Sequence, residues 1–575
     1  MTKHSTSRRN VLTGAAAAGL GVLGATRLLG RPVTGAPAGG AAMNGAAGVA
    51  ALTPSAAPLT PSATPLTPSA APAGTAAAAG LPTASANTTG TTLASGLVDA
   101  DPLTHLLRRA TYGATPESLT EVRTLGAAAW IERQLDPAAI ADPVCDDLLT
   151  RLPMARMTIT QVRGEVTAGR MVKYGWEAMY QVGYAAVARA AWSRRQLFEV
   201  MVDFWSNHLN VTCPFDQGWD NRPDYDRAVI RPHTLGRFAD MLKASAKHPA
   251  MLNYLDNRSS TKTRPNENYA RELMELHTVG LIHTEDDVQN AARLLTGLTT
   301  DTNNGLYRYS STSHAVGAVK VLGFSHANST AGGGEAAAMA MLDHLASHPA
   351  TAARLARKLC VRFVADDPPQ PLVDRLAAVY LANGTAIKPV LRELFRSAEF
   401  AAAAGGKVRT PYEGVIATIR ALGLAPEQKT VSNPGWHGLR SLYWMVDSLG
   451  QAPMAWHPPN GYPDVAAAWA SPAGLLGRWN ENLNLAAGWW PKQLTRPASM
   501  LAHLAGPLPA TYGGLVDALT RRLLGVVVAE RHRTALAAFY GKTPGSALRA
   551  TDAAATWAFP YLVALILDSP YFQAR

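Results

Sequence analysis

Polar residues between positions 266 and 280 place two carboxylates and an amide at helical spacing. At ~100° per residue, Asn268, Glu272 and Glu275 lie at i, i+4 and i+7 and share one face. Two carboxylates one turn apart can act as acid and base or, with an imidazole from another helix, bind a borderline divalent metal ion. We interpret Glu272 and Glu275 as candidate catalytic residues and Asn268 as a candidate substrate-binding residue. The cofactor stays unknown, and a divalent metal ion fits this set.

The same helix has a second interpretation as a solvated surface element. Arg271 lies four residues before Glu275, and such an exposed ion pair is worth ~0.3–0.5 kcal/mol. Arg271 points about 40° from Glu275 but about 100° from Glu272, so it cannot neutralise both carboxylates. We therefore keep Arg271 as a candidate substrate-binding residue. Glu275 and His277 point roughly 160° apart on a helix and do not form a ligand pair.

A further group of candidates lies in the segment Phe-Trp-Ser-Asn-His at 204–208. His208 shares an apolar stripe with Phe204 and Trp205, which is typical of a hydrogen-bonded core histidine. The alternative is a ligand or base at the interior end of a long helix. We take His208 as a candidate catalytic residue and Trp205 and Asn207 as candidate substrate-binding residues.

The loop at 456–464 combines aromatic rings, prolines and a carboxylate. One interpretation is a rigid loop that covers the core. The other is a platform on which the flat rings of Trp456 and Tyr462 contact the apolar faces of a sugar or peptide. We include both rings among the candidate substrate-binding residues.

Helical patterns dominate the chain that must position these residues. Thr115 followed by Pro116 is typical of a helix start. Further helices are predicted at 176–209, 266–279, 285–295, 335–348, 351–363, 372–381 and 514–528. The best strand candidate is 319–322, and long loops are expected at 256–266, 299–334 and 451–472. We predict an all-α fold: one large multi-helix domain with long irregular loops and at most a minor short-strand element.

The N-terminal region indicates export. Arg8 and Arg9 precede an apolar run. An arginine pair followed by such a run is typical of a twin-arginine signal peptide, which we place at 1–31. That run is too short for a confident membrane span, which needs ~20 apolar residues. Residues 32–98 contain no charged side chain and three proline-containing heptads, which predicts a disordered linker. We expect an extracellular or envelope-associated protein with no stable transmembrane span and a folded body at 99–575.

The charge of the chain limits the classes of partner, and the spacing of its cysteines bears on metal binding. The chain carries a net charge of +11, of which the first 31 residues supply +5. No cluster of five to eight basic residues occurs, so we expect no nucleic-acid partner. A mildly basic body fits an anionic cell-wall polymer or polysaccharide. Cys145, Cys213 and Cys360 show no zinc-binding spacing.

Sequence blocks spread over the body resemble the DUF1800 family of exported bacterial proteins. The blocks occur in family order at His105–Gly113, Phe204–His208, His248–Asn257, Pro265–Leu276, Thr284–Gly297 and Leu449–Pro453. The resemblance implies export and a helical architecture but no established reaction. It also implies a partner, because such proteins are often encoded beside a sulfatase-like exported family, DUF1501. The chain departs from the family pattern at His277 and Tyr462.

Two classes of function remain open. The first is an exported enzyme that acts on an envelope or extracellular polymer through the helix carboxylates, by a hydrolytic or metal-assisted step. The second is a non-catalytic binding or assembly partner of the sulfatase-like protein. No Gly-x-Ser-x-Gly elbow, P-loop or His-Glu-x-x-His motif is present. The discriminating observation is whether Asn268, Glu272 and Glu275 face a cavity shared with His208.

Overall fold

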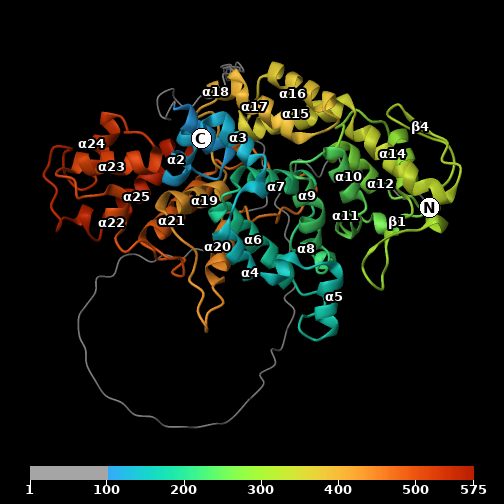
Figure 1. Ribbon diagram of the computed structural model, residues 1–575, viewed down its shortest axis with the longest axis horizontal. Coiled ribbons are helices and arrows are strands. Elements are labelled where there is room, and N and C mark those ends of the chain that lie inside the picture. The colour runs from blue at the N-terminus through green and yellow to red at the C-terminus, as the bar shows by residue number, and fades with distance from the viewer. Residues whose placement is uncertain (1–100) are drawn as a thin grey trace, which may run out of the picture. The chain divides into compact units, whose positions relative to one another are not determined.

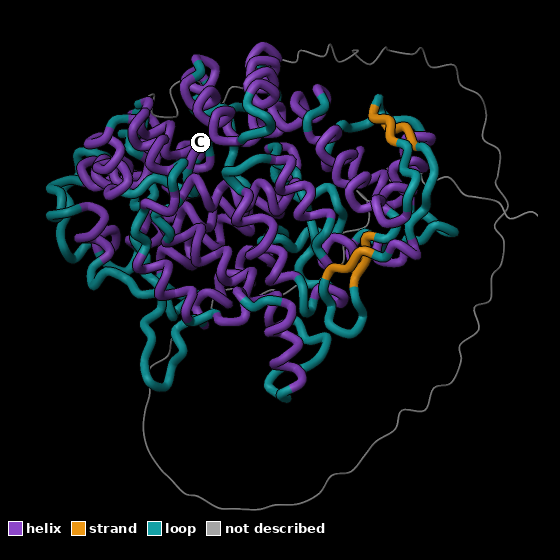
Figure 2. The backbone as a smooth tube through the Cα atoms, turned by 45° about the vertical axis from the view of Figure 1, so that its right-hand side comes forward, coloured by secondary structure: helices purple, strands orange, loops and turns teal. Residues whose placement is uncertain are grey.

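A computed structural model describes residues 101–575 (Figure 1). The predicted signal peptide at 1–31 and the predicted linker at 32–98 lie outside the described residues. The described part is mainly helical, with loops between the helices and two short antiparallel hairpins (Figure 2). The predicted all-α fold with a minor strand element is therefore confirmed. Within residues 101–575, no helix combines the length and the hydropathy that crossing a membrane requires.

Short helices form the first part of the described chain. Thr115 begins one of them as predicted: its side chain accepts a hydrogen bond from the Ser118 backbone, and Pro116 occupies the first turn. The helices are α1 (Pro102–Ala110), α2 (Pro116–Leu125), α3 (Ala127–Gln134), α4 (Pro143–Thr150), α5 (Ile159–Thr167), α6 (Glu177–Trp192) and α7 (Gln196–His208).

The single long helix predicted at 176–209 is wrong, because the chain turns between α6 and α7. Ser193 is extended, and its hydroxyl donates to Asp142 Oδ2 at 2.5 Å. The Gln196 amide donates to the carbonyls of Ala190 and Ser193 at 3.0 and 2.8 Å. These side chains satisfy backbone groups that a break would otherwise leave unpaired, so the chain can turn here.

The middle of the chain contains the helix that carries the predicted carboxylates. Its helices are α8 (Arg222–Tyr225), α9 (Arg231–His233), α10 (Phe238–Ala246), α11 (Pro249–Tyr254), α12 (Glu267–Glu272), α13 (Glu285–Leu295) and α14 (Gly334–Ala346). A π-helical turn, Leu273–His277, follows α12 directly. This turn changes the direction in which side chains project after Glu272, so regular α-helical spacing does not describe Glu275 and His277.

Both hairpins lie within the region between α13 and α14 that we expected to be mainly loop. In the first, β1 (Leu298–Thr300) pairs with β2 (Tyr307–Tyr309), and Thr299 lies opposite Arg308. In the second, β3 (Val319–Val321) pairs with β4 (Phe324–His326). The strand predicted at 319–322 is confirmed, whereas the loop at 299–334 is more ordered than expected.

The last part of the chain begins with a long helix, α15 (Pro349–Phe363). It packs on α16, and further along the chain α19 packs on α6 and α21, and α21 on α25. The bounds are α16 (Gln370–Ala382), α17 (Ile387–Arg396), α18 (Ala398–Ala402), α19 (Pro411–Leu422), α20 (His437–Ser448), α21 (Pro472–Ala487), α22 (Met500–Ala505), α23 (Tyr512–Leu524), α24 (Glu530–Ala538), α25 (Phe559–Asp568) and α26 (Pro570–Gln573).

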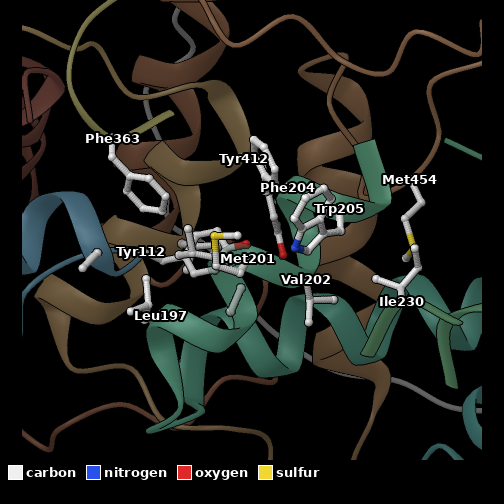
Figure 3. Packing of buried hydrophobic residues seen from close by; sticks show 14 of the residues in the cluster. Tyr112, Leu197, Met201, Val202, Phe204, Trp205, Ile230, Phe363, Tyr412 and Met454 are labelled. Carbon is white, nitrogen blue, oxygen red and sulfur yellow. The ribbon is translucent and has the colours of Figure 1, made fainter. Parts of the chain in front are cut away.

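Helix α7 is a central element of the hydrophobic core. Met201 and Trp205 are fully buried and belong to the same cluster as Tyr112 and Tyr412 (Figure 3). The face of α7 that carries Met201 and Trp205 is thereby held in place by packing. A second face, which carries Asp203 and Asn207, borders a cavity.

Candidate functional site

A cavity of about 470 Å³ lies between α7, α15 and the loop at 451–464. One face of each helix and one side of the loop form most of its wall. The polar and aromatic residues that line it are Asp203, Phe204, Asn207, His208, Arg354, Arg357, Lys358, Arg362, Thr410, Gln451, Trp456, Asn460, Tyr462 and Asp464. A cavity of this size can enclose a small ligand or one or two units of a polymer.

The loop rests directly on α7 through Asn207. The Asn207 side chain accepts a hydrogen bond from the Tyr462 backbone N–H at 3.2 Å and donates to the Asp203 carbonyl at 3.0 Å. Gly461 has φ of +71°, and a Cβ there would lie 2.2 Å from the Asn207 carbonyl oxygen. Only glycine fits this approach, so Gly461 sets the position of the loop over the cavity.

Trp456 and Tyr462 form an aromatic wall of the cavity. Their ring centroids lie 5.0 Å apart, and both rings are half-buried. The Trp456 indole N–H donates to Asn460 Oδ1 at 2.8 Å, which fixes the ring within the loop. The structure therefore places both predicted aromatic residues at the same cavity as His208 and Asn207.

His208 is buried, and both of its ring nitrogens have protein partners. Nε2 lies 3.0 Å from the His277 carbonyl oxygen, which can only accept, so Nε2 carries the hydrogen. Nδ1 therefore accepts from Lys358 Nζ, 3.0 Å away. Burial, followed by the charge of Lys358, holds the pKa of His208 well below its ordinary value. His208 is therefore a neutral acceptor for Lys358.

Lys358 and Arg354 bring two basic groups to the cavity from successive turns of α15. Burial, with repulsion from Arg354, lowers the pKa of Lys358 to about 7. Among the described residues, neither side chain has a carboxylate within 4.0 Å. Arg354 Nε is buried without a hydrogen-bond partner. Sequence reasoning missed both residues, although their i, i+4 spacing on a predicted helix was a usable signal.

Asp203 places a carboxylate on the α7 side of the cavity. Burial raises the pKa of Asp203 to about 6, although Arg362 opposes this shift. Within residues 101–575, the Asp203 carboxylate makes neither an ion pair nor a side-chain hydrogen bond. Sequence reasoning missed Asp203 as well, even though it lies four residues before Asn207.

Glu413 shows the contrasting environment for a carboxylate near the cavity. It is buried, which favours a raised pKa, but Arg362 and Arg575 outweigh burial and lower the pKa of Glu413 to about 2. Arg362 forms an ion pair with Glu413, and Arg575 Nη2 lies 3.2 Å away from it. Glu413 is therefore charged at neutral pH and structural, whereas Asp203 can exchange a proton near neutral pH.

The predicted carboxylate face on α12 does not border the cavity. Arg271 pairs with Glu285 at 2.7 Å, Glu275 lies 3.4 Å from His283, and Asn268 donates weakly to the Leu255 carbonyl at 3.5 Å. Neither these residues nor Glu272 contribute to the cavity wall. The structure thus does not bring Glu272 and Glu275 together with His208. The part of the chain from 101 to 575 contains no group of three His, Cys, Asp or Glu residues placed to hold a metal ion.

Trp205 is a core residue rather than part of the cavity wall. Its side chain is fully buried, and its indole N–H donates to the Thr234 carbonyl at 2.9 Å. Its ring stacks on Phe238 with centroids 5.5 Å apart. Trp205 therefore supports the helix that carries Asp203 and His208 without reaching the cavity.

The fold and the cavity define an all-α protein with an aromatic-walled cavity that carries charges of both signs. The chain belongs to the family described as Protein of unknown function (DUF1800), whose model matches residues 105–574. This match confirms the resemblance seen in the sequence blocks. No curated protein and no solved structure matches the chain.

Proposed function

We propose that this protein is an exported enzyme that acts on an envelope or extracellular polymer at the cavity between α7 and α15. The observation that carries the proposal is the Asp203 carboxylate, which borders the cavity without an ion pair in the described chain and has a pKa raised by burial to about 6. A group with a pKa close to the working pH exchanges protons efficiently in catalysis. Asp203 is thus the proposed general acid and base.

The aromatic wall supplies the contact with the polymer. Trp456 and Tyr462 are half-buried rings at the same cavity, and flat rings pack on the apolar faces of sugar units. In a hydrolytic step, protonated Asp203 would donate its proton to the leaving oxygen, and the resulting carboxylate would accept a proton from the attacking water. The polymer bond breaks, and water supplies a hydroxyl group to one product and a proton to the other.

Export is part of this proposal and rests on the twin-arginine pattern at Arg8 and Arg9, which lies outside the described residues. The mildly basic chain favours an anionic cell-wall polymer or polysaccharide over a neutral one. Such a polymer meets the protein only beyond the cytoplasmic membrane.

The test is an activity screen with the purified protein on cell-wall preparations and acidic polysaccharides, with release of new reducing ends as the readout. We expect Asp203→Asn to lose at least about 100-fold in rate, the usual contribution of general acid–base catalysis. Asp374→Asn is the matched control, because Asp374 is an exposed carboxylate on α16 that does not border the cavity. Equal rates for Asp203→Asn and wild type would contradict the assignment.

The alternative is a binding or assembly partner of the sulfatase-like exported protein. A surface distinct from the cavity favours it: Trp176, Tyr180 and Trp444 form a continuous ring cluster with centroid separations of 6.2 and 5.5 Å. Trp176 and Trp444 are 40% and 38% exposed, so this cluster presents a patch of aromatic surface to solvent, and such patches mark interaction sites. If this surface is the functional one, Trp176→Ala abolishes binding of the partner while Asp203→Asn does not.

A further inference from the structure

We propose that the cavity contains a subsite for an anionic group of the ligand, a carboxylate, sulfate or phosphate, held between Arg354 and Lys358 of α15. This inference rests on the proposed function in one respect only, since it concerns the same cavity. It adds the class of substrate: a polymer unit that carries a negative charge.

The first argument is that these two cations have no anionic partner in the described chain. Arg354 and Lys358 lie four residues apart on α15, so they project from successive turns toward the same cavity. The described residues offer neither of them a carboxylate within 4.0 Å, and Arg354 makes no side-chain hydrogen bond among them. Both residues are half-buried, and a partly desolvated cation without a counter-charge is costly, so a site that keeps two of them points to a ligand that supplies the charge.

The fully buried cations among residues 101–575 each have at least one carboxylate or carbonyl partner, although several of their other nitrogens have none. Lys407 lies 2.7 Å from Asp366 and 3.0 Å from Asp464. Buried arginines without a carboxylate use backbone carbonyls instead: Arg222 Nε donates to Val211 at 3.0 Å and Arg409 Nε to Phe572 at 3.1 Å. Arg354 has neither kind of partner in residues 101–575.

The second argument is the accumulation of basic groups around Lys358. Its hydrogen-bond partner is the neutral ring of His208, and His277 lies behind that ring with centroids 6.3 Å apart. Burial, with the charges of Lys358 and Arg354, lowers the pKa of His277 as well. Burial lowers the pKa of Arg354, and the charge of Glu275 opposes this shift. Glu275 forms no ion pair with Arg354 and lies 3.4 Å from His283.

The remaining charged groups of the cavity neither neutralise Arg354 and Lys358 nor offer a second free pair of cations. Arg357 pairs with the exposed Asp367 at 3.1 Å, and Arg362 is committed to Glu413 and Asp464. Asp203 is the acid of the proposed reaction, and its pKa responds to Arg362 rather than to Lys358 or Arg354. An anion between Arg354 and Lys358 would therefore supply the counter-charge that no carboxylate of the described residues provides within 4.0 Å.

Anion binding should also be coupled to the protonation of Lys358. Near neutral pH, part of the protein carries Lys358 as an uncharged amine, and a bound anion favours the ammonium form. Binding should therefore take up protons from the buffer. A merely structural lysine would not produce this uptake on ligand addition.

The experiment is isothermal titration calorimetry of the full chain with inorganic phosphate, sulfate or acetate at constant ionic strength. It is run at pH 7.5 in two buffers of different ionisation enthalpy. We expect one site, binding of at least one of the three anions, and proton uptake on binding. The ranking of the three anions distinguishes a phosphate, a sulfate and a carboxylate ligand.

Variants decide whether the site is the proposed one. We expect Lys358→Met to weaken binding at least tenfold and to remove the proton uptake, and Arg354→Met to weaken binding similarly. Lys358→Arg, which keeps the charge, should retain binding but lose the uptake, because arginine stays protonated. Lys492→Met is the control, since Lys492 is exposed and does not border the cavity.

Failure of the subsite and failure of the enzyme can be told apart. If wild type binds none of the three anions, or if Lys358→Met binds them equally well in a folded protein, the subsite is wrong even where Asp203-dependent activity is present. If the anions bind as expected and Asp203→Asn leaves hydrolysis unchanged, the subsite holds and the catalytic proposal falls.

Discussion

Lys358 Nζ of α15 lies 3.0 Å from Nδ1 of His208 on α7, so the hydrogen-bond partner of this half-buried lysine is a neutral ring. The His277 carbonyl fixes the tautomer of that ring from the other side. The contact joins two helices about 150 residues apart in the chain, and it defines one end of the cavity.

The first prediction concerns the cost of keeping Lys358 in place. The pKa of Lys358 is lowered to about 7, so the unfolded chain binds an extra proton between pH 7 and the ordinary lysine value of 10.5. Stability therefore rises with pH through this window, and the penalty is fully present below it. We expect Lys358→Met to raise the free energy of unfolding at pH 6 by at least about 1 kcal/mol. Chemical denaturation at pH 6 and 9.5 checks this, and a variant less stable than wild type at both pH values would contradict it.

The second prediction concerns the charged pair beneath the cavity. The pKa of Glu413 is lowered to about 2 by Arg362 and Arg575 against the effect of burial, so its stabilising effect is present above the ordinary carboxyl value and lost as pH falls toward 2. Glu413→Gln leaves the buried Arg575 without a carboxylate and Arg362 with only Asp464, 3.7 Å away, and should cost about 3–5 kcal/mol at pH 7. Glu393→Gln, in a half-exposed pair with Arg375, serves as the control and should cost less than about 1 kcal/mol. Thermal unfolding measures both variants. If Glu413→Gln and Glu393→Gln lose similar stability, burial does not strengthen the contribution of the Glu413 ion pairs, which contradicts the prediction.

The third prediction tests the seating of the aromatic loop. Gly461→Ala would place a Cβ 2.2 Å from the Asn207 carbonyl oxygen, so the loop must move away from α7. We expect at least a tenfold loss of polymer affinity, measured by co-sedimentation, with the helical circular dichroism spectrum retained. Gly506→Ala is closely matched, because Gly506 has φ of +72° but open space around its Cβ position. Gly506→Ala should bind like wild type, and equal polymer affinity for Gly461→Ala and Gly506→Ala would contradict the role of the contact with Asn207.

The fourth prediction concerns export. The twin-arginine pattern requires both guanidinium groups, so changing Arg8 and Arg9 to lysine should retain the protein in the cytoplasm. Cell fractionation and immunoblotting of the native host measure the distribution, with Lys3→Arg as a control that keeps the arginine pair. Normal export of the double-lysine variant would exclude this route.

Much of the fold could be predicted from the sequence because it depends on local signals. The start of α2 at Thr115 and the strand at 319–321 follow from capping and β-branched residues close in sequence. The break between α6 and α7 could not be predicted, because it depends on Asp142, more than 50 residues before Ser193. The π-helical turn at 273–277 likewise replaces the regular spacing on which the carboxylate face was built.

Only part of the candidate site could be predicted from the sequence, because the site also depends on contacts between residues far apart in the chain. Asn207, His208, Trp456 and Tyr462 were chosen from their residue types and do share one cavity. Helical spacing states which residues share a face, but it does not state which faces of distant helices meet. The opposition of α7 and α15, and with it Lys358, therefore required the tertiary structure.

The most direct test of the central claim is the pH–rate profile of polymer cleavage for wild type and Asp203→Asn, with Asp374→Asn as the control. The account predicts that the wild-type rate changes with an apparent pKa of about 6, that Asp374→Asn keeps this transition, and that Asp203→Asn loses it together with at least about 100-fold in rate. An unchanged profile for folded Asp203→Asn would contradict the account.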